Sequence, residues 1–273
     1  MQPGCFTLQT NEFLPEVNGS WDGFPRFAGI HMSPVYFASA QANLNTAKAI
    51  IDLWPYLFQN DGTVHPSIAT ELDTLGKQYL DANLGKIFAF YIMDEPTGHN
   101  ISKTSMEAAI AAVKTRFPGI PTYSIYAQDC FDNASSLDAK CGMAGKRGVP
   151  SNLDWVGFDW YMPSDTSNDT TVFKTQITDT VTRLKSLTTK PIILVPDVTD
   201  QMLQSLAVNW RDYWLSERFK RYAALMRLDT QVKGIDAYAW VQHGNACSTT
   251  GTTISGARYW PSVRTALYQE SIK

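Results

Sequence analysis

The chain has little of several features that mark common classes of protein. Its 273 residues contain no run of about 20 apolar residues, the length that a membrane-spanning helix needs. Charged residues make up 18% of the sequence, the formal net charge is -3, and no block of Lys or Arg occurs. Nucleic acids and anionic membranes are bound through clustered positive charge. We therefore expect no nucleic-acid partner and no membrane partner.

The sequence also lacks the short motifs by which many enzymes hold a cofactor, a metal ion or an activated serine. No GxGxxG and no GxxxxGK(S/T) occurs, which excludes the usual glycine-rich phosphate loops. The four histidines form no HxH, HExxH or HxxxH pattern, and no GxSxG is present. We therefore expect no cofactor and no metal ion.

Cysteine is scarce, but its number is even. Cys130 and Cys141 bracket a polar segment of about ten residues, and Cys5 with Cys247 would tie the two ends of the chain together. This arrangement predicts two disulfides and a secreted or extracellular protein. Four reduced thiols in a cytosolic protein remain the alternative. Four N-x-S/T sequons favour secretion slightly, and they lie at Asn18, Asn100, Asn133 and Asn168.

Short apolar runs that are rich in β-branched and aromatic residues recur along the chain, and each ends in a polar loop. These runs predict eight strands, of which the first is weak: Cys5–Gln9, Phe27–Met32, Lys48–Leu53, Lys86–Met93, Pro121–Tyr126, Leu153–Tyr161, Pro191–Pro196 and Ile235–Val241. Helical patterns lie between them at Pro66–Leu84, Ser102–Phe117, Thr170–Leu187 and Trp210–Leu228, with a terminal helix at Trp260–Tyr268.

Near-continuous apolar strands that alternate with amphipathic helices indicate an α/β protein with a parallel sheet covered by helices. Eight such units in 273 residues fit a (β/α)8 TIM barrel. We expect one catalytic domain over residues 1–273, because no linker or internal repeat is visible. A doubly wound open sheet is the alternative, and it is disfavoured by the missing glycine-rich phosphate loop.

Polar and aromatic residues gather where the predicted strands end. In a (β/α)8 barrel these carboxyl ends build the active site. All four histidines lie in or next to the loops that follow these ends, and they are His31, His65, His99 and His243. Substrate-binding residues are expected there, and they are His31, Trp54, Trp160, Tyr161, Trp240, Gln242 and His243. The aromatic members present flat apolar rings that suit stacking against sugar rings, so a carbohydrate is the expected partner.

The segment FYIMDEP, residues 90–96, ends an apolar strand on two adjacent carboxylates. Glycoside hydrolysis uses two carboxyl groups, one that donates a proton and one that attacks the sugar or activates water. Negative charge on Asp94 disfavours a second charge on Glu95, so one of these two groups should keep its proton near neutral pH. We expect Glu95 to be the acid, while a plain turn that begins at Asp94 is the alternative.

These motifs together make the chain resemble the clan A glycoside hydrolase barrels. In that clan strand four ends in Asn-Glu-Pro, strand six reads roughly Asp-x-x-Gly-x-x-x-Tyr, strand seven follows Lys-Pro and ends in the nucleophilic Glu, and strand eight ends in Trp. The matching segments here are DEP at 94–96, LDWVGFDWYMP at 153–163, KPIILVPD at 190–197 and GIDAYAWVQ at 234–242. The resemblance covers about the second half of the chain and implies that Glu95 is the acid/base residue.

The sequence departs from the clan at two positions. Asp94 stands where the clan has Asn, and Asp197 stands one place late and is one carbon shorter than the clan's Glu. The second catalytic carboxylate is therefore expected to be Asp197 or Asp159. A shorter side chain leaves room for a water molecule between the carboxyl groups, which suits an inverting reaction.

The sequence therefore predicts a monomeric glycoside hydrolase that cleaves an oligosaccharide or polysaccharide. Two alternatives stay open. A noncatalytic carbohydrate-binding barrel would keep the aromatic residues without a working carboxylate pair. A metal-dependent barrel hydrolase would use the histidines and Asp residues at the strand ends as ligands.

Overall fold

The computed structural model describes residues 29–44, 48–127, 149–160, 169–198, 203, 205–236 and 261–271. The chain forms two compact units, and each is described by itself. The N-terminal unit comprises residues 27–157 and 183–191, and the C-terminal unit comprises residues 1–26, 158–182 and 192–273. The expectation of a single domain stays a prediction.

Seven strands form a sheet in which their order follows the chain, β1 to β7. They are β1 (Gly29–Met32), β2 (Lys48–Asp52), β3 (Ile87–Asp94), β4 (Thr122–Ala127), β5 (Trp155–Trp160), β6 (Ile192–Pro196) and β7 (Val232–Ile235). The pairs β1–β2, β2–β3, β3–β4 and β6–β7 are parallel. The α/β class and the parallel sheet are confirmed, and the weak first strand at Cys5–Gln9 lies outside the described residues.

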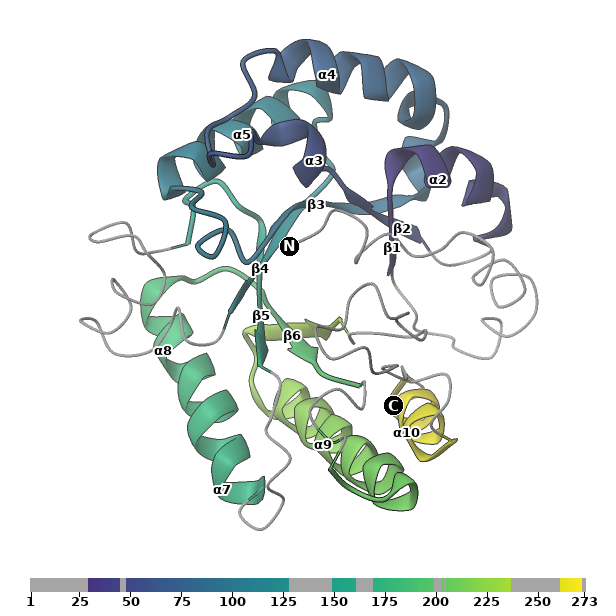
Figure 1. Cartoon of the computed structure of the whole chain (residues 1–273), viewed down its shortest axis with the longest axis vertical. Helices are drawn as coiled ribbons and strands as arrows, with labels where there is room; N and C mark the ends of the chain where they lie inside the picture. The colour runs from purple at the N-terminus through teal and green to yellow at the C-terminus, as the bar shows by residue number, and fades with distance from the viewer. Residues whose placement is uncertain are drawn as a thin grey trace. The chain divides into compact units, whose positions relative to one another are not determined.

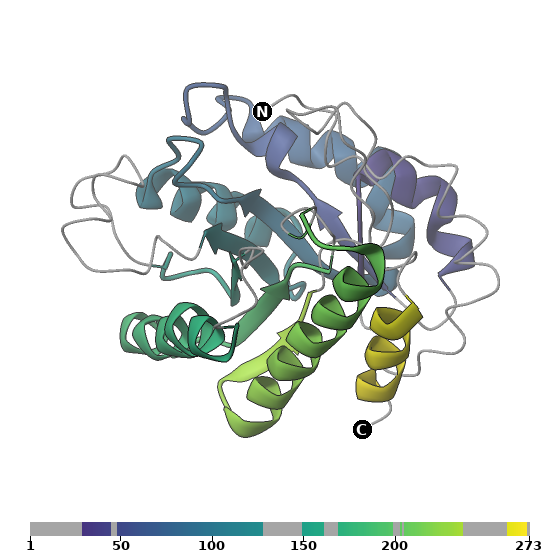
Figure 2. The same cartoon turned by 60° about the horizontal axis from the view of Figure 1, so that its bottom comes forward.

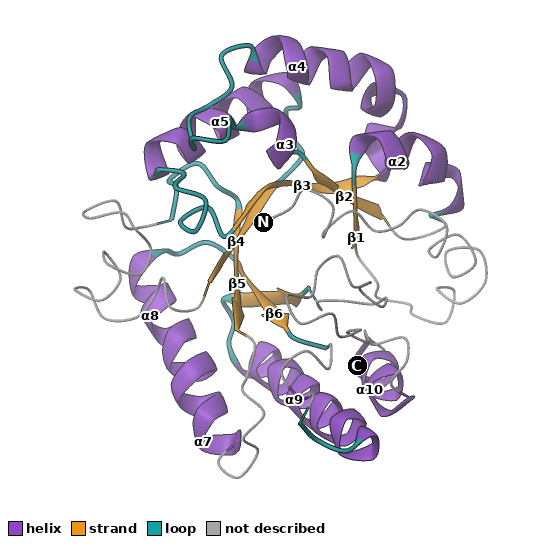
Figure 3. Ribbon diagram, in the orientation of Figure 1, coloured by secondary structure: helices purple, strands orange, loops and turns teal. Residues whose placement is uncertain are grey.

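The N-terminal unit is built around strands that are apolar on both faces. In β3, the adjacent residues Phe90 and Tyr91 are both buried although their side chains point to opposite faces, as expected for a parallel sheet with covered faces. The helices α2 (Pro34–Ala40), α3 (Trp54–Leu57), α4 (Ile68–Leu75) and α5 (Lys103–Arg116) belong to this unit. They are grouped along β1 to β3 in Figure 1, and Figure 3 shows the strands and helices in contrasting colours.

Helix α5 follows the sequence prediction closely because residues at its two ends determine where it begins and ends. The Ser102 hydroxyl oxygen accepts a hydrogen bond from the Ser105 N–H at 3.0 Å and caps the first turn. Met106, Ile110 and Val113 recur at helical spacing and are buried. The helix ends before Pro118, which cannot continue it.

The predicted helix over Pro66–Leu84 is confirmed in position, but its type changes along its length. Helix α4 passes into a π-helical turn (η3, Gly76–Leu80) and then a 3-10 segment (η4, Asp81–Lys86). Arg116 reaches across this region and pairs with Asp81 at 2.6 Å. The apolar spacing indicates a helix but carries no signal for the change of helix type, which accommodates such local packing.

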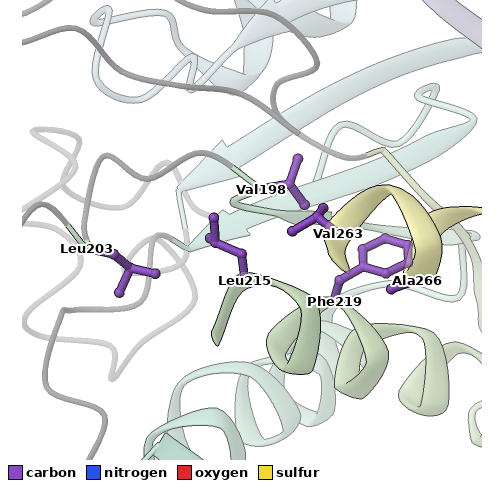
Figure 4. Packing of buried hydrophobic residues seen from close by; sticks show 6 residues of the cluster. All are labelled: Val198, Leu203, Leu215, Phe219, Val263 and Ala266. Atoms are coloured by element: carbon purple, nitrogen blue, oxygen red, sulfur yellow. The ribbon is translucent and has the colours of Figure 1, made fainter. Parts of the chain in front are cut away.

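The C-terminal unit has its own apolar cluster, made by Val198, Leu203, Leu215, Phe219, Val263 and Ala266. Figure 4 shows Leu215 and Phe219 of α9 (Val208–Leu228) facing Val263 and Ala266 of α10 (Pro261–Ser271). The two helices lie side by side, as Figure 2 also shows. Asp212 of α9 fixes this pairing, because its carboxylate accepts hydrogen bonds from the first N–H groups of α10, 3.0 Å from Ser262.

The last strand and one predicted helix differ from the prediction in detail. Strand β7 spans Val232–Ile235, and Asp236 is no longer in a strand, whereas the predicted strand began at Ile235. Residues 237–241 of that predicted strand lie outside the described residues. The predicted helix over Thr170–Leu187 consists of α7 (Asp169–Phe173), a π-helical turn (η6, Lys174–Thr178) and α8 (Asp179–Leu187).

The short helices α2 and α3 were not predicted. The beginning of α2 carries a recognisable signal, since Ser33 caps the helix and Pro34 occupies its first turn. None of the described helices is long and apolar enough to cross a membrane.

Candidate functional site

The carboxyl end of β3 contains an irregularity that changes where its side chains lie. Strand β3 pairs with β4 through Tyr91 and Tyr123 and again through Asp94 and Ile125, so β3 advances by three residues while β4 advances by two. Such a β-bulge shifts the alternation of side chains. It brings Asp94 to the same side as Tyr91, whose hydroxyl group donates a hydrogen bond to Asp94 Oδ1 at 2.7 Å.

Glu95 follows directly and has an uncommon backbone conformation. Its φ angle is 40°, in the left-handed region that residues other than glycine rarely adopt. The conformation is held from both sides, since the Glu95 N–H donates to the Ile125 carbonyl at 3.0 Å and the Glu95 carbonyl accepts from the Gly98 N–H at 2.9 Å. Strain of about 1–3 kcal/mol of this kind is found mainly at functional sites. This backbone conformation sets the direction in which the half-buried Glu95 side chain leaves the strand.

The ends of β1 and β2 contribute a second polar pair. His31 Nδ1 lies 2.9 Å from Asp52 Oδ1, and the two side chains are 24% and 20% exposed. The His31 ring meets the Tyr91 ring edge to face, with centroids 4.8 Å apart. The pair formed by His31 and Asp52 is therefore in contact with the pair formed by Tyr91 and Asp94. We call these four residues the β1–β3 polar cluster.

Tyr123 of β4 packs against this cluster and depends on a glycine. Its ring centroid lies 5.5 Å from that of Tyr91 and 6.3 Å from that of His31. A Cβ atom on Gly157 would lie 2.7 Å from the Tyr123 hydroxyl oxygen, which is too close for any side chain. Glycine at position 157 therefore makes room for the tyrosine that supports Tyr91.

The pKa of the Asp94 carboxyl group is raised above its usual value. Burial is the largest cause, and the negative charge of Asp52 acts in the same direction. The hydrogen bond from Tyr91 and the charges of His31 and His99 act the other way, but they do not cancel the effect of burial. Asp94 therefore keeps its proton to a higher pH than an ordinary aspartic acid.

Burial also raises the pKa of Tyr91 well above its usual value, and the charge of Asp94 adds to the effect. The phenol therefore stays protonated and remains the donor to Asp94. Asp94 is the acid of the β1–β3 polar cluster whose environment favours the neutral form.

Two of the predicted catalytic carboxylates belong to the C-terminal unit. Asp159 lies near the end of β5 and Asp197 follows β6 directly, and they are 7% and 8% exposed. Trp160, the last residue of β5, is half-buried, and its carbonyl oxygen accepts from the Tyr222 hydroxyl group at 3.5 Å. All three predicted residues therefore lie at or beside a strand end, as the sequence suggested.

The remaining predicted residues divide into two groups. Trp54 is half-buried and begins α3 just beyond β2, and His65 lies in the loop before α4, where its Nδ1 atom accepts from the Ser67 N–H at 3.3 Å. Four others lie outside the described residues, namely Tyr161, Trp240, Gln242 and His243. The cysteines lie outside them too, so the disulfides stay a prediction. Within the described parts of the chain, no group of three or more His, Cys, Asp and Glu side chains is arranged to hold a metal ion.

Sequence reasoning missed Asp52, Tyr91 and Tyr123. Asp52 carried a usable signal, because it lies near the end of the predicted strand Lys48–Leu53, which follows the predicted strand that contains His31. Tyr91 carried none. Strict alternation along β3 places it on the opposite face from Asp94, and only the bulge brings the two together.

No protein-family model and no curated protein sequence matches the chain. Solved structures do. The β-D-glucuronidase of Dictyoglomus thermophilum superposes with a TM-score of 0.64 and 12% identity over 94% of this chain and 46% of that one. A Ruminococcus gnavus β-glucuronidase superposes with a TM-score of 0.62 and 12% identity, over 97% of this chain and 46% of that one. A GH113 β-1,4-mannanase superposes with a TM-score of 0.55 and 12% identity, over 96% of this chain and 93% of that one.

The chain thus spans about half the length of the two glucuronidases and nearly the whole length of the mannanase. The superpositions show a shared fold, and at 12% identity they show nothing about the reaction of this chain. The structural neighbours are glycoside hydrolases with a TIM-barrel-like fold, in agreement with the clan A resemblance of the sequence.

Proposed function

We propose that the protein is a glycoside hydrolase in which Glu95 donates a proton to the leaving oxygen of a glycosidic bond. One observation carries this proposal: Glu95 is held in a strained left-handed conformation at the carboxyl end of β3, beside the β1–β3 polar cluster. Two carbonyl–amide hydrogen bonds fix its backbone, so the direction in which the side chain leaves the strand is set before any substrate arrives. The likeness of the fold to glycoside hydrolases supports the choice of reaction.

The second carboxylate of the proposed reaction is Asp197 or Asp159. Both are buried acids next to the carboxyl end of a strand, which is the part of an α/β barrel that carries catalytic groups. In the inverting form of the reaction this carboxylate takes a proton from water, the water oxygen bonds to the anomeric carbon, and Glu95 protonates the departing oxygen. In the retaining form the carboxylate itself bonds to the anomeric carbon first.

Substrate binding is proposed for the polar and aromatic residues at the strand ends. His31 and Trp54 come from the N-terminal unit, and Trp160 comes from the C-terminal unit. The same role is proposed for Tyr161, Trp240, Gln242 and His243. A neutral sugar fits side chains that combine flat rings with hydrogen-bonding groups. We propose a monomer that needs no cofactor.

The proposal is tested by reducing-sugar release from a panel of polysaccharides and aryl glycosides. The parent protein should release sugar from at least one substrate, and Glu95→Gln should lower the rate by about 100-fold or more, the usual size of general-acid catalysis. Glu217→Gln is the matched control, since Glu217 lies on α9 in an exposed pair with Lys220. Equal rates in Glu95→Gln and the parent would refute the role of Glu95. Sugar binding without any release would favour a noncatalytic binding barrel.

We also propose that the protein is secreted with disulfides between Cys130 and Cys141 and between Cys5 and Cys247. Mass spectrometry of peptides cleaved without reduction should find both cross-linked pairs in protein secreted by its own host. Four free thiols in that sample would contradict the pairing.

A further inference from the structure

We propose that the first two turns of α9 carry a second carbohydrate-binding site, in which the rings of Trp210 and Tyr213 stack on pyranose rings of a neutral polysaccharide. The site lies on the exposed side of a helix, whereas the residues proposed above for substrate binding lie at strand ends. The choice of a carbohydrate rests on the proposed function. The site would make a polymer a better substrate than a small glycoside.

Large aromatic side chains are exposed at the beginning of α9. Trp210 and Tyr213 are 54% and 47% exposed, and Val208 beside them is exposed as well. Helical spacing puts the two aromatic residues on the side of α9 that points away from Leu215 and Phe219, which face α10 in Figure 4. Single exposed apolar residues are common, but adjoining exposed aromatic residues indicate a binding surface.

These rings are held in place by one another and by the core. Tyr213 contacts Trp210 edge to face, with centroids 5.9 Å apart, and it contacts Trp214 in the same manner at 5.2 Å. Trp214 in turn packs against the apolar cluster of the C-terminal unit. A row of three rings therefore runs from the core to the surface. Side chains that are ordered in advance lose little conformational entropy when a ligand binds.

The two charged residues between Trp210 and Tyr213 are engaged within the protein. Arg211 Nε donates to the Leu206 carbonyl oxygen at 2.7 Å, and Asp212 accepts from the first N–H groups of α10. Both contacts also fix the start of α9. The exposed side chains of its first two turns carry no charge, and they are Val208, Asn209, Trp210 and Tyr213. Such a surface favours a neutral ligand over a charged one.

The size and chemistry of this surface favour a sugar over a protein partner. The exposed parts of Val208, Trp210 and Tyr213 amount to roughly 300 Å², given the usual area of such side chains. A stable protein–protein interface takes about 800 Å² from each partner. The ring faces suit the apolar faces of pyranose rings, and the Trp210 N–H, the Tyr213 hydroxyl group and the Asn209 amide are able to hydrogen-bond with sugar hydroxyl groups.

The position of the surface within the C-terminal unit points to a polymeric ligand. Strands β6 and β7 are parallel, and α9 connects them and packs against both. The helix therefore runs opposite to the strands, and its first turns lie toward the carboxyl end of β6, which Asp197 follows directly. A polysaccharide is long enough to contact both places. Attachment at two places strengthens the binding of a polymer but not that of a single sugar.

The binding test measures retention on insoluble cellulose, linear mannan and β-1,3-glucan. It compares Glu95→Gln with double variants that add Trp210→Ala, Trp210→Phe or Leu228→Ala. Glu95→Gln should be retained on at least one polysaccharide, Trp210→Ala should weaken this retention about 10-fold or more, and Trp210→Phe should restore most of it because a ring is kept. Leu228→Ala is the matched control, since Leu228 is an exposed apolar residue at the other end of α9. Equal retention of all four proteins, or no retention on any polysaccharide, would overturn the inference.

A kinetic test separates this site from the proposed reaction. The rate on a polysaccharide divided by the rate on an aryl glycoside should fall about 10-fold in Trp210→Ala and should keep the parent value in Leu228→Ala. An unchanged ratio in Trp210→Ala overturns the inference and leaves the glycosidase proposal standing. Retention that depends on Trp210, without sugar release by the parent protein, refutes the proposed reaction while the binding site on α9 holds.

Sedimentation velocity distinguishes a sugar-binding site from a contact between two copies of the chain. The parent protein and Trp210→Ala should both sediment as monomers, because the exposed surface is too small for a stable dimer. A parent dimer that Trp210→Ala dissociates would assign the surface to a second copy and overturn the inference.

Discussion

Two aspartates of the N-terminal unit lie at opposite ends of their strands, Asp94 at the carboxyl end of β3 and Asp154 at the amino end of β5, and they experience opposite environments. Asp154 lies just before β5, and its carboxylate accepts hydrogen bonds from Lys114 Nζ at 2.7 Å, the Thr122 N–H at 2.8 Å and the Thr122 hydroxyl group at 2.9 Å. Burial would raise its pKa, but these hydrogen bonds hold it below the usual value. Asp94, at the carboxyl end of β3, accepts a hydrogen bond from the Tyr91 hydroxyl group and has a raised pKa.

The difference agrees with the proposal that the amino ends of the strands serve stability and the carboxyl ends serve function. At the amino end the charge of Asp154 is satisfied by its neighbours, as is usual for a structural carboxylate. At the carboxyl end the pKa of Asp94 is raised and the backbone of Glu95 is strained. Proteins keep such costs mainly where a ligand or a reaction repays them. The same division between the two ends of the strands is general in (β/α)8 barrels.

The interior between the two ends should be the least tolerant of change. Gly157→Ala should destabilise the protein by about 1–3 kcal/mol, because the new methyl group would clash with Tyr123 and Ile125. Urea unfolding of the variant measures this loss. Gly85→Ala is the matched control, since a Cβ at position 85 would meet nothing within 4 Å. Equal stability of the two variants would show that Tyr123 is free to move away.

The amino end should lose stability without losing activity. Asp154→Ala removes the acceptor of three hydrogen bonds and should cost about 1–2 kcal/mol at neutral pH. Because the folded-state pKa is lowered, this contribution is present above the unfolded pKa and disappears as pH falls through the folded pKa. Urea unfolding at two pH values checks both statements. A loss of sugar release at full folding would break the contrast between the ends.

The carboxyl end should gain stability when its strain is removed. Glu95→Gly puts a residue that tolerates positive φ at a position where φ is 40°. The relief of strain should raise the free energy of unfolding by about 1 kcal/mol while activity is lost. Thermal unfolding of Glu95→Gly and Glu95→Ala distinguishes the two effects, because only glycine relieves the backbone. A destabilised glycine variant would show that Glu95 contributes to stability as well.

Asp94→Asn should have the smallest effect on stability and the most informative pH dependence. A raised pKa means that the folded protein holds this proton more tightly, so its stabilising contribution is lost as pH rises through the folded pKa. The variant should therefore be more stable than the parent at neutral pH, by up to about 1 kcal/mol, and not at acidic pH. The same difference in free energy of unfolding between Asp94→Asn and the parent at both pH values would contradict the raised pKa.

Elements with strong local signals could be predicted from the sequence. The apolar run of β3 and the serine cap and apolar spacing of α5 each fix an element within a residue or two. The position of Glu95 at a strand end follows from the same pattern. The resemblance to clan A barrels agrees with the fold of the structural neighbours.

The local backbone geometry at the end of β3 could not be predicted from the spacing of apolar residues. The bulge in β3 and the left-handed Glu95 arise from pairing with β4, and pairing between distant segments leaves no periodic trace. The sequence therefore pointed to Asp94 and Glu95 but not to the contact between Tyr91 and Asp94. The π-helical turns after α4 and α7 were missed for the same reason, because tertiary packing decides them.

The central claim is that Glu95 is the proton donor of the carboxyl end, and leaving-group dependence tests it most directly. Aryl glycosides with a weakly basic phenolate leave without a proton, whereas those with a strongly basic one need it. Glu95→Gln should therefore lose about 100-fold or more in kcat/KM on a phenyl glycoside and little on the matching 2,4-dinitrophenyl glycoside. An equal loss on both substrates would contradict the account, because it would assign Glu95 to attack or to structure.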